Sequence, residues 1–535
     1  MIPKWYSPQL PEKDSALFYW ALFIAWGIVV SATLPYHEFW RDEVRALSYA
    51  MGSSTLTDLL RSLENEGHPA LWHLLLYAGY RATASTLVLP VLSFLIAAAA
   101  VYLFIFFSPF PRWIKTLFVF SGLPIYEYSV MARNYGISML LLFAFAAAYP
   151  SRKTHPLMVG CILAFLCNTN IHSLILGCLL MGFWMWDTFF TERRPFLSKE
   201  GYKLYAAMGI VIAGNASALY TVWPTEQIVT SGTTSYTMAQ IREALATAIV
   251  APATQFNDLF PNWFPIKLRI ASLLWAVIGL FVRPPIFFIA YAALLILSVF
   301  FSIVYMGFYR HQGLLVVFLV SLYWIVLDKE GSGLPYKPSH KIFQVWFYGG
   351  LAALLASIVT TGAMHVYRDW TYQKSASKAF AQEFLRTHQE FEDAILVGEP
   401  DYLLEAVHYY AKNRHYIVRE KRFGNTVRFV RSAQLNLRMG ELLCAAWRIQ
   451  KEESKPVLIV LGHRYLGGSS WDASTSPKSI SYPFQRTFTW STEEIADWKR
   501  HTKVQRQFDE NVIGDEAYTV YSLIFPEIQP NRCIN

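Results

Sequence analysis

Two adjacent carboxylates, Asp42 and Glu43, follow the first membrane-length apolar segment of this 535-residue chain. Acidic side chains at the end of a membrane span are costly unless they face water or a polar cavity, so they mark a functional site. A carboxylate in such a place can accept a proton from a hydroxyl group within hydrogen-bonding distance. The pair also opens a helical stretch to about residue 60, and acidic residues suit any helix start. The sequence therefore predicts an active site here, with helix capping as the alternative.

Further polar residues flank other apolar segments. His68 precedes a proline suited to the first turn of a helix, where a lone histidine is more often a cap or interface residue than a catalytic one. Glu127 and Arg133 lie in one turn between two apolar runs, and Arg310 and His311 lie in another. An arginine at a helix end commonly extends its head group to the membrane interface, which is the alternative to a role in binding.

The composition predicts a membrane protein. Hydrophobic residues make up 54% of the chain and its mean hydropathy is +0.28, which is too apolar for one soluble domain of this length. We expect an α-helical polytopic protein with eleven spans, near residues 16–34, 84–107, 116–129, 135–149, 157–169, 173–190, 204–222, 268–282, 286–306, 312–327 and 342–363. The first run lacks a small-residue cleavage site after it and should remain as a helix. The apolar run 69–80 is too short to span, so we expect it in the interface.

The distribution of lysine and arginine predicts the orientation. With the N-terminus in the cytoplasm, most basic loop residues fall inside, including Arg112, Lys153 and Arg194, and the external loops are poorer in them. If 69–80 crossed the membrane, every later segment would reverse and so would this bias. The same loops account for the formal charge of +8, so we reject nucleic-acid binding. The polar residues described above then share the external side.

From residue 364 the composition becomes that of a soluble domain. A helical stretch at 375–389 is followed by buried-strand patterns at 393–398 and 457–462. Strands that alternate with helices predict a small α/β domain. We therefore expect a transmembrane domain at 1–363 and an extracytoplasmic α/β domain at 364–535. No G-x-G-x-x-G motif follows either strand, which disfavours a nucleotide-binding fold.

Two remaining features concern the external side. Cys444 and Cys533 lie in the polar C-terminal part, and a disulfide between them is compatible with export of this part.

The long loop 223–267 contains an amphipathic stretch at 238–249 and a turn at 256–261. This loop is suited either to cover a site entrance or simply to lie in the interface.

Taken together, the motifs resemble a known family. They are the Asp-Glu pair at 42–43, His-Pro-Ala-Leu at 68–71, Ala-Arg-Asn-Tyr at 132–135 and Arg-His at 310–311. This set is similar to the bacterial branch of the protein O-mannosyltransferase-like glycosyltransferases of the GT-C superfold, related to glycosyltransferase family 39. The group includes lipid A aminoarabinose and galacturonic acid transferases. The resemblance covers residues 15–330 and departs from the common His-Pro-Pro at Ala70, which bears on the role of His68.

The resemblance implies transfer of a sugar from a polyprenyl-phosphate donor to an acceptor hydroxyl of a glycolipid, glycan or protein, with inversion at the anomeric carbon. It also implies a bacterial cytoplasmic (inner) membrane, with the reaction on the outer side. The acceptor hydroxyl must lose its proton as it attacks, and Asp42 is our candidate general base, worth typically about 10²- to 10⁴-fold. Adjacent helix residues point about 100° apart, so we expect Glu43 to support Asp42 or to orient the acceptor.

The leaving phosphate gains negative charge as the glycosidic bond breaks, and nearby cations stabilise it. The candidates for this role are Arg133, Arg310 and His311, with His68 as a fourth. Arginine suits the role because its guanidinium can donate two hydrogen bonds to a phosphate at once. Side chains expected to contact the acceptor or to support the site are Glu127, Tyr135 and His172.

We expect neither a catalytic metal nor a cofactor. Carboxylate and imidazole ligands are present at His37, Glu38, Asp42, Glu43 and His68. The D-x-D pattern of metal-dependent oligosaccharyltransferases with related architecture is missing, however. The rival hypotheses are a lipid or glycan transporter or flippase, and a non-catalytic scaffold for envelope assembly. No internal repeat typical of transporters is found, and the polar residues cluster on one face.

Overall fold

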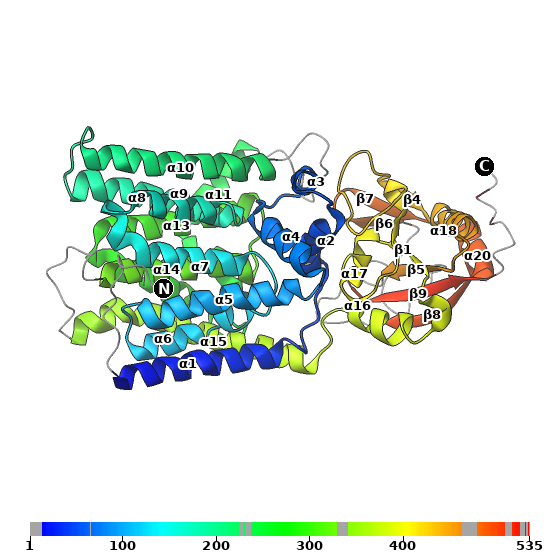
Figure 1. Ribbon diagram of the computed structural model, residues 1–535, viewed down its shortest axis with the longest axis horizontal. Coiled ribbons are helices and arrows are strands. Elements are labelled where there is room, and N and C mark those ends of the chain that lie inside the picture. The colour runs from blue at the N-terminus through cyan, green and yellow to red at the C-terminus, as the bar shows by residue number, and fades with distance from the viewer. Residues whose placement is uncertain are drawn as a thin grey trace.

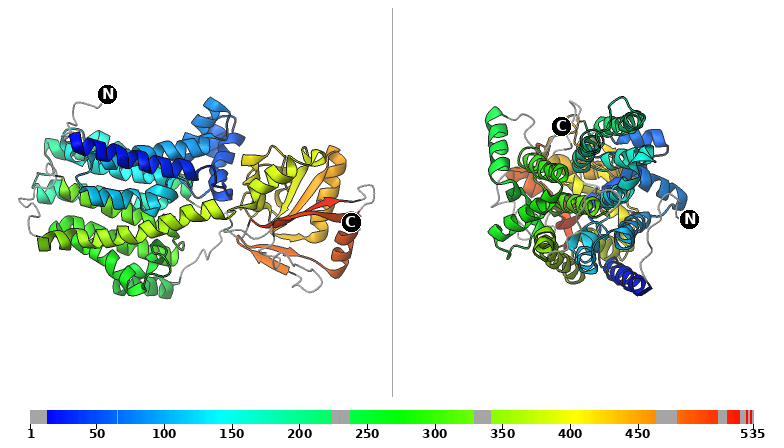
Figure 2. Two further views of the ribbon diagram at one scale, coloured as in Figure 1. Left: turned by 90° about the horizontal axis from the view of Figure 1, so that it is seen from below. Right: turned by 90° about the vertical axis from the view of Figure 1, so that its left-hand side faces the viewer.

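The computed structural model describes residues 13–64, 66–223, 229, 237–328, 341–462, 479–508, 516–524, 530 and 533. A helical bundle forms one part of the molecule and a mixed α/β region forms the other, and three short helices lie at the bundle end that faces this region (Figure 1). Figure 2 shows the long helices side by side and the C-terminal region beyond one end of them.

Seven helices in the described part of the chain are long and apolar enough to cross a membrane. They are α1 (Lys13–Thr33), α5 (Val88–Phe107), α9 (Ile171–Trp186) together with the π-helical turn η3 (Asp187–Thr191) that continues it, α10 (Lys199–Val222), α13 (Pro284–Ile303), α14 (Tyr309–Leu327) and α15 (Lys341–Thr371). The chain is therefore a multi-pass helical membrane protein, as its composition predicts.

The four other expected spans contain shorter helices. These are α6 (Arg112–Val119), α7 (Tyr135–Ala148), α8 (Pro156–Cys167) and α12 (Ile266–Ile278), and short 3₁₀ turns, η2 (Tyr149–Lys153) and η5 (Gly279–Val282), extend α7 and α12. The segment expected at 116–129 is divided, because α6 ends before Gly122 and a π-helical turn, η1 (Leu123–Glu127), follows with Pro124 in its first turn. Proline lacks the amide hydrogen that would continue the helix. By length and composition, seven of the eleven expected segments thus contain a helix in the described residues that could cross a membrane by itself.

The helices divide into an inner and an outer set. In α14, 89% of the residues in its apolar stretch are buried inside the protein, compared with 22% of those in α1 and in α10. A helix that is apolar on every side and buried belongs to a core, and one whose apolar residues remain exposed requires a lipid surface. Large apolar side chains are indeed exposed along the outer helices at Leu17, Ile28 and Tyr220. α14 is therefore the central helix, and its first turn lies at the end where the short helices gather.

The three short helices are α2 (Arg41–Gly52), α3 (Leu56–Ser62) and α4 (Leu71–Thr83). α4 corresponds to the apolar run 69–80 and, at 13 residues, is too short to cross a membrane. Its buried Trp72 and Leu76 share one apolar cluster with Val44 and Leu47 of α2. This packing holds α2 across the end of the bundle, with its first turn next to the loop that follows α1.

The long loop 223–267 is helical in its described part. The amphipathic stretch forms α11 (Met238–Val250), which packs on α13, and a 3₁₀ stretch, η4 (Pro252–Leu259), follows it. Residues 224–228 and 230–236 of the loop lie outside the described residues.

The C-terminal region, which begins at α16 (Ala376–Ala379), is built on a four-stranded sheet with the order β1-β5-β9-β8. Its strands are β1 (Ile395–Glu399), β5 (Val457–Gly462), β9 (Tyr518–Leu523) and β8 (Thr502–Phe508). β1 and β5 pair in parallel, with Ile395 opposite Val457, and the other pairs are antiparallel. Both strands predicted at 393–398 and 457–462 are thus confirmed.

Smaller elements complete this region. They are a π-helical turn η6 (Phe380–Leu385), α17 (Val407–Tyr410), the hairpin β2 (Tyr416–Ile417) and β3 (Arg422–Phe423), α18 (Met439–Glu453), α20 (Thr492–His501), and a three-stranded sheet of β4 (Asn436–Arg438), β7 (Arg486–Thr489) and β6 (Ser479–Tyr482). A disulfide joins Cys444 of α18 to Cys533, the pairing that the sequence allowed. α15 continues past residue 363 to Thr371, so the expected domain boundary falls within this helix.

Candidate active site

Two segments that are distant in the sequence, together with the neighbouring Arg41, bring positively charged side chains to Asp42 in the first turn of α2. Arg133, in the turn before α7, donates a hydrogen bond from Nη1 to Asp42 Oδ2 at 2.7 Å. Arg310, in the first turn of α14, places Nη2 at 3.6 Å from the same oxygen. Arg41 Nε lies 3.6 Å from Asp42 Oδ1. The structure therefore gathers the carboxylate and both arginines that the sequence singled out.

The Asp42 carboxylate is accessible, whereas its partners are enclosed. The Asp42 side chain is 31% exposed, compared with 10% for Arg133 and 13% for Arg310. Burial alone would disfavour the charged carboxylate, but the positive charges of Arg133, Arg41 and Arg310 prevail and hold the pKa of Asp42 well below its usual range. Asp42 is thus ionised at neutral pH and faces solvent beside three guanidinium groups.

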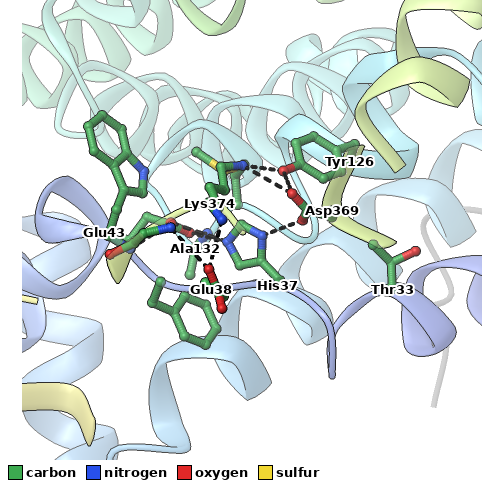
Figure 3. Close-up of polar contacts among 12 residues, drawn as sticks. Thr33, His37, Glu38, Glu43, Tyr126, Ala132, Asp369 and Lys374 are labelled. Carbon is green, nitrogen blue, oxygen red and sulfur yellow. Dashed lines mark hydrogen bonds and ion pairs between the residues drawn. The ribbon is translucent and has the colours of Figure 1, made fainter. Parts of the chain in front are cut away.

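Glu43 has a different environment and is fully buried. Its Oε1 accepts the Ala132 backbone N–H at 2.8 Å and lies 3.0 Å from His37 Nε2. The other ring nitrogen, His37 Nδ1, lies 2.6 Å from Asp369 Oδ2 near the end of α15. Figure 3 shows His37 between these two carboxylates. Glu43 thus anchors α2 to the bundle, which favours the supporting role expected for it.

The protonation of His37 follows from this position. Two carboxylates accept from the two ring nitrogens, so each nitrogen must carry a hydrogen and the ring is an imidazolium. Burial lowers the pKa of His37, but the charge of Glu43 and hydrogen bonds to Asp369 and Glu43 outweigh it and raise the pKa to about 8. A buried positive charge between two negative ones joins α1, α2 and α15 at one point.

A second group of contacts lies beside His37. Tyr126 donates its hydroxyl hydrogen to Asp369 Oδ1 at 2.7 Å, and Lys374 Nζ contacts the Tyr126 hydroxyl and lies 3.5 Å from Asp369 Oδ1. The backbone N–H groups of Lys374 and Ser375 donate to Glu38 Oε2 at 2.7 and 3.0 Å. Figure 3 shows Lys374 and Tyr126 around Asp369. Sequence reasoning missed Asp369 and Lys374, although a charged residue at the end of the apolar α15 was a usable signal.

His68 stands at the edge of the site. Its Nδ1 lies 3.8 Å from Glu66 Oε1, its side chain is 38% exposed, and it is within electrostatic range of Asp42 and Arg133. Partial burial lowers the pKa of His68, Glu66 opposes this effect, and Arg133 adds to it, so that the pKa falls below its usual value. A neutral imidazole here can exchange hydrogen bonds with a ligand but adds no charge.

His311, Tyr135 and His172 form a layer of rings near the arginines. His311 Nδ1 accepts the Phe308 backbone N–H at 3.0 Å, so its neutral ring carries the hydrogen on Nε2. Its centroid lies 5.5 Å from that of Tyr135 and 5.0 Å from that of His172. The Arg133 guanidinium lies 5.8 Å from the Tyr135 centroid. Tyr135 and His172 are thus in supporting positions, and His311 presents one N–H donor.

Glu127 ends the π-helical turn η1 and is buried. Its carboxylate interacts electrostatically with three cations of the site, Arg310, Lys374 and Arg133. Turns of this type are frequent at functional sites, because they displace a side chain from the regular helical path. Glu127 therefore balances the positive charge behind Asp42.

The geometry supports recognition of an anion. Two guanidinium groups that converge on one carboxylate oxygen can equally donate to a phosphate, and the accessible carboxylate between them can take a proton. Among the described residues, no three His, Cys, Asp or Glu side chains are grouped as metal ligands. His37, Glu38 and Glu43 are engaged with protein partners instead.

No protein-family model matches the sequence, and no curated protein matches it. Among solved structures, the chain is similar to the arabinofuranosyltransferase AftD from mycobacteria, with a TM-score of 0.39 and 12% sequence identity. The match covers 98% of this chain and 40% of that chain, so this chain spans less than half the length of that protein. A likeness this distant leaves the function to be argued from the residues.

Proposed function

We propose that the protein is a membrane glycosyltransferase. It moves a sugar from a polyprenyl-phosphate donor in the lipid bilayer to a hydroxyl of a glycolipid, glycan or protein acceptor on the extracytoplasmic face, with inversion and without a metal or cofactor. The observation that carries this proposal is the accessible Asp42 carboxylate between Arg133 and Arg310, beside the apolar bundle. A proton acceptor and a phosphate-binding pair in contact are the parts that such a transfer requires.

The reaction assigns a role to each part. The acceptor oxygen attacks the anomeric carbon from the face opposite the phosphate, and its proton passes to the Asp42 carboxylate. The bond from the anomeric carbon to the phosphate oxygen breaks, and its electron pair remains on the phosphate. Arg133 and Arg310 stabilise the charge that grows on this oxygen, and His311 Nε2–H and His68 are further donors. Glu43, Glu127, Tyr135 and His172 hold these groups in place.

The contact between Asp42 and Arg133 also implies an order of binding. A carboxylate held by guanidinium groups is a weak base, because its negative charge is already stabilised. When a donor phosphate engages Arg133 and Arg310, it competes with Asp42 for the same N–H donors. The carboxylate then regains basicity where the acceptor hydroxyl arrives. Donor binding thus precedes and activates proton abstraction.

The bacterial inner membrane is the location that the family resemblance implies. Two observations support the proposed orientation, with the C-terminal domain (364–535) outside and the N-terminus in the cytoplasm. Basic residues are concentrated in the loops assigned to the inside. The Cys444–Cys533 disulfide suits an oxidising compartment. The domain at 1–363 would then carry the reaction at its outer end.

The test is mass spectrometry of envelope glycolipids and glycans from a strain that lacks the protein. The strain is complemented with wild type, Asp42→Asn, or the control Glu64→Gln, which changes an exposed carboxylate between α3 and α4. Membrane abundance is matched. We expect wild type and Glu64→Gln to restore a missing sugar and Asp42→Asn to fail. Equal restoration by all three would exclude Asp42 as the base and favour the transporter or scaffold hypothesis.

A further inference from the structure

We propose that the C-terminal region is a positioning part of the active site, which acts through Glu405 and Glu516 on the helix that carries Asp42. The consequence for turnover rests on the proposed function, whereas the structural claim does not. The region approaches the segment 38–45 on both sides of Asp42, and α17 lies next to α2 (Figure 1).

The first contact point is the start of α2. The first N–H groups of a helix have no partner within it and carry partial positive charge. The Arg41 N–H, first in α2, donates to Glu516 Oε1 at 2.9 Å, and Ser375 Oγ donates to the other Glu516 oxygen. Two residues earlier, the Phe39 N–H donates to the Tyr410 hydroxyl at 2.6 Å. The C-terminal region therefore fixes the backbone immediately before Asp42.

The second contact point lies one turn after Asp42. Arg45 donates from Nη1 to Glu405 Oε1 at 2.6 Å and from Nη2 to the Val427 carbonyl at 3.1 Å, both in the C-terminal region. The same Glu405 oxygen accepts the Val427 N–H at 2.7 Å. Glu405 is buried, so removal of its charge leaves Arg45 without a compensating anion on that side.

Arg45 also leads to the other side of the site. It donates from Nε and Nη2 to the Glu66 carboxylate at 3.0 and 2.9 Å, and Glu66 Oε1 lies 3.8 Å from His68 Nδ1. Alternating charges thus run from Glu405 through Arg45 to Glu66, and Glu66 lies next to the neutral His68. One buried carboxylate of the C-terminal region holds both Asp42 and His68. Misplacement of a reacting group by about 1 Å can cost about 10²-fold in rate.

Hydrogen exchange in the full-length protein in nanodiscs tests the structural claim without an activity assay. The variants are Glu405→Gln and Glu516→Gln, and the control is Glu453→Gln, which breaks the exposed pair with Arg414 within the same region. We expect exchange at residues 41–52 to rise about tenfold in both variants, with β5 and α18 unchanged, because the helix opens locally. Unchanged exchange at 41–52 in both variants would overturn the inference.

The turnover claim is tested by steady-state transfer with a short-chain polyprenyl-phosphate donor. We expect Glu405→Gln to lower kcat about tenfold or more with a smaller change in the donor KM, and Glu405→Asp to recover part of the lost kcat, because Asp42 on α2 is displaced directly and His68 only through Arg45 and Glu66. A kcat equal to that of Glu453→Gln would overturn this claim. If wild type transferred no sugar, the proposed function would fail, and the exchange result would still decide the positioning claim.

Discussion

His37 Nδ1 lies 2.6 Å from Asp369 Oδ2, a contact that ties the loop after α1 to the end of α15. On its other side the same ring reaches Glu43 at 3.0 Å, in the helix that carries Asp42. The first and last long helices of the bundle therefore set the position of α2 through one imidazolium. This arrangement separates two neighbouring carboxylates by role, because Glu43 is used for anchoring and Asp42 remains available.

Stability should depend on the charge of His37. The pKa of His37 is raised from 6.5 to about 8, so the folded protein binds this proton more tightly than the unfolded chain does. The resulting stabilisation, about 2 kcal/mol, is complete below pH 6.5 and is lost as the pH rises through about 8. We expect the melting midpoint to fall between pH 6.5 and 8.5, and His37→Gln to remove this slope. His388→Gln, at an exposed position, is the control; an equal slope in His37→Gln would contradict the prediction.

The two carboxylates should respond differently to amide substitution. Glu43→Gln leaves one acceptor oxygen for the Ala132 N–H and an amide group against the His37 ring, so a buried charge loses its partner. We expect a destabilisation of about 3 kcal/mol or more. Asp42→Asn, at a partly exposed position, should abolish transfer with little change in melting. Melting curves and transfer assays on both variants check whether Glu43 is needed for stability and Asp42 for transfer. A Glu43→Gln variant as stable and as active as wild type would refute the anchoring role.

Much of this arrangement was predictable, and the reasons are specific. Helices lie in all eleven expected segments because long apolar runs leave few alternatives, and β1 and β5 follow from short buried runs. The chemistry of Asp42, Arg133 and Arg310 pointed to one site because each lies next to an apolar segment. The expected segment at 116–129 is divided, since apolar composition does not reveal where Gly122 and Pro124 interrupt a helix.

The partners of Glu43 could not be predicted in the same way. Asp369 and Lys374 meet His37 and Tyr126 only through the packing of α15 against the start of the chain, and no local periodicity records such a contact. The link from Arg45 to Glu405 likewise joins two regions that the composition separates into different domains. Pairings at long sequence separation depend on tertiary geometry, which single-residue patterns do not contain.

Donor binding should depend more on Arg133 than on Arg310. Arg133 makes the shorter contact with Asp42, at 2.7 Å, compared with 3.6 Å for Arg310. Removal of a preorganised hydrogen-bond donor that stabilises the growing negative charge of a transition state typically lowers the rate by about 10²- to 10³-fold. We expect the transfer rate to fall by this factor in Arg133→Gln and by a smaller factor in Arg310→Gln. Arg133→Lys should recover only part of the rate, because lysine lacks the planar guanidinium. Transfer rates and donor titrations measure the order. A larger loss in Arg310→Gln would reverse the assignment.

The pH profile of transfer should report the contact between Asp42 and Arg133 directly. A general base must be unprotonated, so the rate falls as the pH falls through its pKa. Nearby guanidinium charges hold the pKa of Asp42 well below its usual range, and kcat/KM, which reports the free enzyme, should therefore show no acidic limb due to Asp42 near neutrality. Arg133→Gln removes the first of these charges, raises the pKa of Asp42 and moves the acidic limb to higher pH. The control is Arg414→Gln. The Arg414 guanidinium pairs with Glu453, and both residues are distant in the sequence from Asp42 and Arg133. Superimposable acidic limbs for wild type and Arg133→Gln would mean that the titrating base is a group other than Asp42.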